Sequence, residues 1–323
     1  EDESCPIAIA VTASESSSSA STSTSTAEVS DPAMVCGLYA ADLIQHQTRR
    51  LGKLQSEVLA DHDPEPLHQL RVSLRRLRTA LSQFAPALRM PDGVSDRRIA
   101  RVARRTSLCR DLDVLKDRLE GQLLPPLPEE ERKAMKPVLK RLSRNRRLAF
   151  EDLVEALTGG PYLKLLARLR AWQLKPRFSP LGDLPLGPWL FEWQSQASSG
   201  LFLHGGWFAA DPHDPALHDL RKRIKGLRYA LEHLEPFAAP ALGEWIALLK
   251  KAQDCLGDLH DLQVLVAILG DQLEQGVGDT LPVLQAGILA QQAERWSQWS
   301  DQAVHLREQA NRHRLYSSLI TPA

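Results

Sequence analysis

The chain has 323 residues, 43 % of them hydrophobic, which is enough for two domains that each bury a core. It has no run of 18 apolar residues, so we expect no segment that spans a membrane. The 40 Lys and Arg balance the 40 Asp and Glu overall, yet residues 67–178 alone hold 26 basic residues against 12 acidic ones. This strongly basic middle third predicts a polyanionic partner.

Residues 1–33 are predicted to form a disordered tail. They consist largely of Ser, Thr, Ala and acidic residues, which cannot bury enough apolar surface to offset the entropy of the chain. They lack the basic start of a secretory signal and the arginines of a transit peptide, since the first arginine is Arg49. Met34 directly follows this tail and is a candidate start of the functional unit.

The cysteines show no C-x-x-C pair and no zinc-type spacing. We therefore expect reduced thiols and a reducing compartment, the cytoplasm or the nucleus. The four cysteines are Cys5, Cys36, Cys109 and Cys255.

Nearly all of residues 36–323 is predicted to be helical, because Leu, Ala, Arg, Glu and Gln dominate and strand-like alternation is missing. Pro, Gly and acidic N-cap residues mark the breaks between helices. The breaks fall at residues 61–66, 85–96, 123–131, 158–161, 175–188, 211–215 and 270–282. The Pro-rich break before residue 188 separates two halves, which we predict to be helical bundles over residues 34–178 and 179–323.

Two stretches 150 positions apart share one pattern, which predicts a duplicated unit. Residues 68–81 read HQLRVSLRRLRTAL, and residues 218–231 read HDLRKRIKGLRYAL. At the same spacing, RDLDVL at 110–115 matches HDLQVL at 260–265. We therefore predict an all-α fold of two four-helix bundles related by internal pseudo-two-fold symmetry, with the two basic stretches facing one another across the interface.

Each copy places a basic stripe beside an apolar stripe on one helix, because both sets recur at helical spacing. Single-sign stripes in both copies indicate an anion-binding surface. The alternative is a solvated helix face on which long basic side chains cover apolar surface. The stripes consist of His68, Arg71, Arg75 and Arg78 in the first copy, and of His218, Arg221, Lys225 and Arg228 in the second.

Further cations within and after these stretches extend the candidate site. Guanidinium and ammonium groups at helical spacing suit a chain of phosphates, which they attract regardless of sequence. These additional candidates are Arg76, Arg97, Arg101, Arg104, Arg105, Lys140, Arg144, Arg147, Lys222 and Lys251, the last of which matches Arg101.

The histidines at the start of each stripe are open to three interpretations. His68 and His218 are locally satisfied helix-start residues, phosphate ligands, or a metal pair. The metal interpretation is weak because no carboxylate or thiolate cluster accompanies them, and we expect neither a metal nor a cofactor. Asp111 and Asp261 are predicted to form structural ion pairs with the basic helix of their own half, since a lone carboxylate gives little general acid–base chemistry.

These motifs resemble those of CHAD proteins, the conserved histidine α-helical domain family. The resemblance rests on the two basic stretches, on RDLDVL at 110–115 and on LGDLHD at 256–261, and it covers about residues 36–315. It implies two four-helix bundles that bind inorganic polyphosphate through basic surfaces and associate with polyphosphate granules. The phosphate contacts that it implies are the residues of the two stripes.

The chain departs from the family pattern in ways that bear on function. Gly226 stands where the first copy has Arg76, and Asp254 lies opposite Arg104, so we expect the second half to be the weaker binder. The E-x-E-x-K motif of an accompanying triphosphate-tunnel domain is missing from this sequence, as are nucleophile-elbow and P-loop motifs. We therefore expect a non-enzymatic protein whose partner is polyphosphate, with affinity for other polyanions such as sulfate.

Two alternatives stay open. The basic middle third of the chain would also suit a nucleic-acid-binding protein. Single-stranded nucleic acids need aromatic rings on which bases stack, and Phe84 and Tyr229 are the only aromatic residues near the stripes in the sequence. A metal-dependent phosphohydrolase that uses the histidines is the other alternative.

Overall fold

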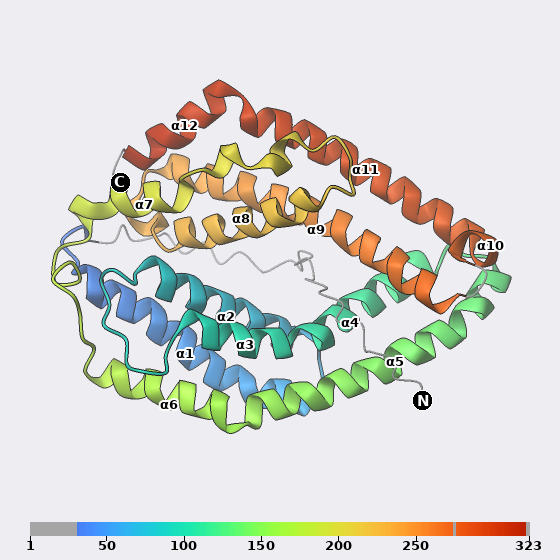
Figure 1. The fold of residues 1–323 in the computed structure, drawn as a ribbon, viewed down its shortest axis with the longest axis horizontal. Coiled ribbons are helices and arrows are strands. Elements are labelled where there is room, and N and C mark those ends of the chain that lie inside the picture. Colours follow the sequence, from blue (N-terminus) through green and yellow to red (C-terminus); the bar gives the residue numbers. More distant parts are fainter. Residues whose placement is uncertain (1–30, 274–275, 321–323) are drawn as a thin grey trace, which may run out of the picture.

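The computed structural model describes residues 31–273 and 276–320, apart from the side chain of residue 272 (Figure 1). The predicted tail, residues 1–33, lies outside these residues except for its last three positions. There the carbonyl oxygen of Pro32 accepts a hydrogen bond from the backbone of Gly187 at 2.9 Å. The start of the described chain thus packs against the connector between the two halves.

The described residues contain no β-strand, only two isolated bridges, so the predicted all-α fold is confirmed. Each predicted break falls between two helices of the structure. The first half holds α1 (Cys36–Ala60), α2 (Glu65–Gln83), α3 (Asp96–Arg105), α4 (Ser107–Arg118), α5 (Glu129–Thr158) and α6 (Gly160–Leu174). The second half holds α7 (Leu190–Ser198), α8 (Pro215–Glu232), α9 (Pro240–Gln272), the short α10 (Val277–Thr280), α11 (Pro282–Arg307) and α12 (Gln309–Ile320).

The two halves form two layers that meet along the basic helices α2 and α8 (Figure 1). Leu70, Leu74 and Leu77 of α2 recur at helical spacing and are fully buried. The basic stripe lies beside these leucines on the same helix, and therefore lies along the boundary between the two layers. The Gln83 side chain crosses this boundary and donates a hydrogen bond to the carbonyl oxygen of Ala230 at 3.0 Å. The predicted approach of the two basic helices is therefore confirmed.

The hydrophobic cores do not follow the halves of the sequence. Leu262 and Leu265 of α9, together with Leu284 of α11, pack into the core to which the helices of the first half also contribute. The first part of α9, from Leu242 to Leu259, packs instead with α8 and the end of α11 in a second core. The boundary at residue 178 and the pseudo-two-fold symmetry accordingly stay predictions.

The predicted breaks do not include those between α3 and α4, between α8 and α9, and between α11 and α12. The stretch that was predicted as one helix divides at Thr106 into α3 and α4, whereas the matching α9 runs without interruption. Thr106 is fully buried, and its hydroxyl donates to the carbonyl oxygen of Ala103 at 2.8 Å. A threonine hydroxyl that bonds the backbone in this way competes with the helical ladder.

The cysteines of the described part, Cys36, Cys109 and Cys255, are free and buried. Burial raises the pKa of Cys36 to about 11, and the pKa of Cys109 and of Cys255 to about 12. These thiols therefore stay protonated and unreactive at neutral pH. None of the described helices is both long and apolar enough to pass through a lipid bilayer.

A buried carboxylate joins the two layers at the end of the molecule where α5 meets α11. Glu131, in the first turn of α5, is 6 % exposed. Its two oxygens accept hydrogen bonds from the backbone amides of Val283 at 2.8 Å and Leu284 at 3.0 Å. These amides open α11, where the helix dipole favours a negative charge.

We expect Glu131→Gln to destabilise the protein by about 1 to 3 kcal/mol, because one charge-assisted acceptor is lost next to buried amides. Urea unfolding followed by circular dichroism measures this change. The control is Glu130→Gln, which removes a neighbouring exposed carboxylate from the same turn. Equal unfolding midpoints for the two variants would contradict the capping role of Glu131.

Candidate anion-binding site

The closest gathering of cations from both halves surrounds one buried ring. Tyr229 of α8 is 1 % exposed. The guanidinium carbons of Arg228, Arg76 and Arg75 lie 4.3, 5.7 and 6.0 Å from the centre of its ring. Arg75 also donates to the Tyr229 hydroxyl at 3.4 Å. The negative face of an aromatic ring attracts cations, so Tyr229 helps to hold three arginines together.

One carboxylate is shared within this cluster. Glu232 accepts a hydrogen bond from Arg76 at 2.9 Å through one oxygen, and from Arg228 through the other. Arg228 also donates to the side-chain oxygen of Gln253 at 3.1 Å. These three guanidinium groups and the Glu232 carboxylate together carry a formal charge of +2. They and Tyr229, hereafter the Tyr229 cluster, are held in place by these contacts.

Two of the predicted phosphate contacts on α2 bond to α3. One guanidinium nitrogen of Arg71 lies 2.9 Å from each of three acceptors at the α3–α4 break: the Ala103 carbonyl and the hydroxyls of Thr106 and Ser107. Arg78 donates two hydrogen bonds to Asp96, at 2.7 and 3.2 Å. Arg71 therefore caps the carboxyl end of α3, where a cation is favoured, and Arg78 binds its first turn.

The cations of α8 are more buried than those of α2. Arg221, Lys225 and Arg228 are 1, 9 and 6 % exposed, whereas the α2 stripe is only partly buried. This burial was not predicted from the sequence, and it arises because α8 packs against α2, α7, α9 and the short helix at residues 205–208. Lys222 lies on the exposed side of α8 and pairs with Asp219 at 3.1 Å.

The histidine of the second stripe pairs with another histidine. The ring centres of His218 and His260 lie 4.5 Å apart. Burial, followed by the nearby Lys222, lowers the pKa of His218, and burial together with His218 lowers the pKa of His260 to about 4. Both rings are therefore neutral at pH 7. His68 is partly buried at the start of α2. Among the described residues, no group of three or more His, Cys, Asp or Glu could hold a metal ion.

The remaining predicted cations lie on other surfaces, and none of them bonds to Tyr229 or Glu232. Arg97 and Arg101 line a pocket between α3 and α6, and Arg105 pairs with Glu155 of α5 at 3.0 Å. A further set is exposed, with its α5 members on the side opposite the buried positions of that helix. This exposed set is Arg104, Lys140, Arg144, Arg147 and Lys251.

The predicted aspartates are buried in the helices that follow the basic ones. Asp111 of α4 is 3 % exposed, and Asp261 of α9 is 8 % exposed. Their pairing with the basic helix of their own half stays a prediction.

Two carboxylates that bridge cations, Glu232 and Asp258, are not among the residues predicted from the sequence. Glu232 follows Arg228 by four positions, a helical spacing that signals an ion pair. Asp258 of α9 binds Arg118 of α4 at 3.4 Å and Arg295 of α11 at 3.2 Å. These three residues lie on three separate helices, so no spacing in the sequence signals their contact.

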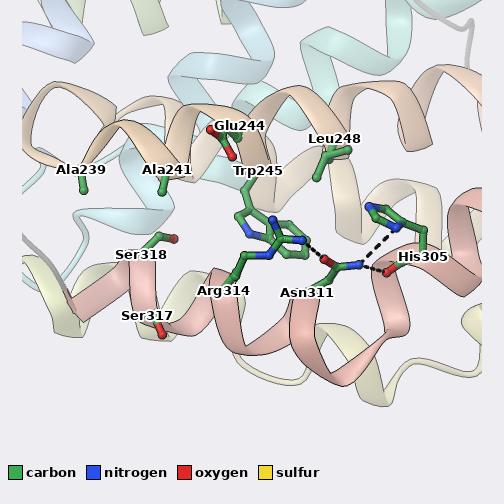
Figure 2. A pocket seen from close by; sticks show the side chains of 10 residues that line it. All are labelled: Ala239, Ala241, Glu244, Trp245, Leu248, His305, Asn311, Arg314, Ser317 and Ser318. Atoms are coloured by element: carbon green, nitrogen blue, oxygen red, sulfur yellow. Dashed lines mark hydrogen bonds between the residues drawn. The ribbon is translucent and has the colours of Figure 1, made fainter.

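A second hollow, of about 350 Å³, lies between α9 and the corner of α11 and α12 (Figure 2). Its polar groups bond mainly to one another: Arg314 donates to Asn311, and the Asn311 amide lies against the ring nitrogen and carbonyl oxygen of His305. The apolar side chains of Trp245 and Leu248 form its other wall. This hollow does not gather cations and is a poor candidate for a polyanion.

We expect Arg71→Ala to lower the free energy of unfolding by about 2 to 3 kcal/mol, because the carbonyl and hydroxyls at the α3–α4 break lose a charged donor. Thermal unfolding measures the loss, and Arg49→Ala, at an exposed position of α1, is the control. A variant as stable as this control would show that Arg71 does not hold α3.

Comparisons with known proteins agree with this architecture. The profile of the CHAD domain matches residues 42–270. The crystal structure of the CHAD domain from the plant Ricinus communis aligns with a TM-score of 0.60 and 22 % identity, over 92 % of this chain and 96 % of that one. PptA from Streptomyces chartreusis aligns with a TM-score of 0.63 and 17 % identity, over 84 % of this chain and 99 % of that one.

A comparison with curated proteins gives no match. The two structural likenesses support the fold, and the profile covers well over half of the chain. With its paired basic helices and all-helical layers, the chain belongs to the CHAD domain family.

Proposed function

We propose that this protein binds inorganic polyphosphate at the contact between α2 and α8. The observation that carries this proposal is the Tyr229 cluster, in which three arginines of both halves gather around one ring and two of them share one carboxylate. A cluster that is already held by Tyr229 and Glu232 offers donors whose geometry is set before an anion arrives. The resemblance to CHAD proteins supports the same ligand.

Polyphosphate suits this site better than nucleic acid does. The nearest aromatic side chain, Tyr229, is 1 % exposed and its ring is already covered by arginines, so it cannot stack on a base. A flexible chain of phosphates needs only charge and donors, which guanidinium groups supply as planar forks. We therefore favour an anion that carries no bases.

We further propose that binding occurs without chemical turnover and serves association with polyphosphate granules. At the Tyr229 cluster the carboxylate of Glu232 accepts from two arginines and is not placed to take a proton from water. Polyphosphate incubated with the protein and Mg²⁺ or Mn²⁺ should release no phosphate. Sustained metal-dependent release would instead support the phosphohydrolase alternative.

We expect the double variant Arg75→Gln, Arg76→Gln to bind long-chain polyphosphate more weakly, by about tenfold to a hundredfold, because two charge-assisted donors are lost. Isothermal titration at several salt concentrations measures this. The slope of log K against log salt should also fall by about 1 to 2, since each neutralised phosphate releases counterions.

The control for this experiment is Lys53→Gln, Lys250→Gln, which removes equal charge from exposed positions of α1 and α9. Equal affinity of the two double variants would refute the α2–α8 site. Competition with excess RNA tests the nucleic-acid alternative. RNA should displace polyphosphate only if the site binds nucleic acid.

Binding should also depend on pH through the histidine pair. His218 and His260 keep lowered pKa values in the free protein. A polyphosphate chain long enough to run along α8 from the Tyr229 cluster to His218 would favour their charged forms and raise both values. Binding therefore takes up protons, and affinity should strengthen as pH falls from about 7 towards about 5. A pH series of titrations measures this, and His218→Asn, His260→Asn should flatten the profile. An unchanged slope in that variant would contradict a role for the pair.

A further inference from the structure

We infer a second anion site in the pocket between α3 and α6, which takes a compact oligophosphate of a few phosphate groups. The pocket has a volume of about 650 Å³. It lies within the first half, on elements other than the α2–α8 contact. Its lining consists of Ser95, Arg97, Arg98, Arg101, Gly160, Pro161, Lys164 and Arg168.

Five of these lining residues are cations, and none is acidic. Within residues 31–273 and 276–320, none of the five side chains forms a hydrogen bond or an ion pair, in contrast to Arg71 and Arg78 on α2. Five like charges around one hollow repel one another and lower stability unless an anion joins them. Uncompensated charge gathered in a concave site is therefore better explained by a ligand than by a structural role.

Two helices begin at this pocket. α3 starts beside Ser95, and α6 starts at Gly160 and Pro161, so the positive ends of both helix dipoles lie at the pocket. The acidic residue in the first turn of α3, Asp96, is bound by Arg78 and does not line the pocket. The backbone thus adds positive potential to the side-chain charges.

The loop before α3 is shaped to accommodate one of the arginines. Gly93 has a φ of +85°, a left-handed conformation that favours glycine. A Cβ atom at this position would lie 2.0 Å from a guanidinium nitrogen of Arg168. The missing side chain of Gly93 therefore leaves room for the Arg168 guanidinium beside the pocket.

The size and charge of the pocket define the class of ligand. A single phosphate, with a charge near −2, would leave most of the five cations unmatched. A triphosphate group carries a charge of about −4 to −5, close to the charge of the pocket, and its oxygens suit several guanidinium forks at once. We therefore assign the pocket to tripolyphosphate-like ligands, whether free oligophosphate or the phosphate moiety of a nucleotide.

The test is isothermal titration of the full chain with tripolyphosphate. The pocket variant is Arg98→Gln, Lys164→Gln, Arg168→Gln, all at exposed positions, and the control variant is Lys53→Gln, Lys175→Gln, Lys250→Gln. The pocket variant should lose affinity on the order of a hundredfold, since three charged donors are removed, while the control changes little. Circular dichroism checks that both variants fold.

Further arms separate this site from the α2–α8 contact and identify the source of the phosphates. Arg75→Gln, Arg76→Gln should keep the tripolyphosphate site, so the two proposals fail independently. Competition by a nucleoside triphosphate at the same concentration would indicate a nucleotide, and its failure a free oligophosphate. Equal losses in the pocket and control variants would overturn the site. Equally tight binding of inorganic phosphate would overturn the oligophosphate assignment.

Discussion

At the contact between α2 and α8, arginines from two helices share one partly buried volume, where their mutual repulsion has to be offset. Tyr229 offers its ring face to three of them, and Glu232 bonds two of them at once. Asp258 has the same bridging role further along the layer boundary, between Arg118 and Arg295. A carboxylate that serves two cations reduces repulsion and still leaves a net positive charge, so the layers can associate without losing attraction for an anion.

The basic residues described above fall into three groups. Some bond to one another's partners within the Tyr229 cluster, as Arg76 and Arg228 do through Glu232. Others shape the scaffold: Arg71 and Arg78 hold the two ends of α3 against α2. Cations without such bonds, among them Arg98 and Lys164, face a pocket that the scaffold creates. A charge-reversal experiment that includes Arg71 or Arg78 would disturb folding as well as binding, because both residues hold α3 in place.

The sequence predicts most of the fold but only part of the site. Pro and Gly mark the helix breaks locally, whereas the break at Thr106 depends on a buried hydroxyl and on Arg71, which is 35 positions away. Periodicity placed the basic stripes on α2 and α8 correctly, yet the burial of Arg221 and Lys225 follows from how many elements surround α8. The α3–α6 pocket joins residues as distant as Arg97 and Arg168, and helical spacing carries no information at that separation.

The clamping of α3 also determines how the two proposed sites relate. Arg78 fixes the first turn of α3 and Arg71 fixes its end, so α3 is tied to the same helix that supplies Arg75 and Arg76 to the Tyr229 cluster. A ligand couples two sites only if it binds two arrangements of the protein with different affinity. With α3 held at both ends, an anion in the α3–α6 pocket meets a platform that is already fixed. The two sites should therefore act independently, and each can be altered without changing the affinity of the other.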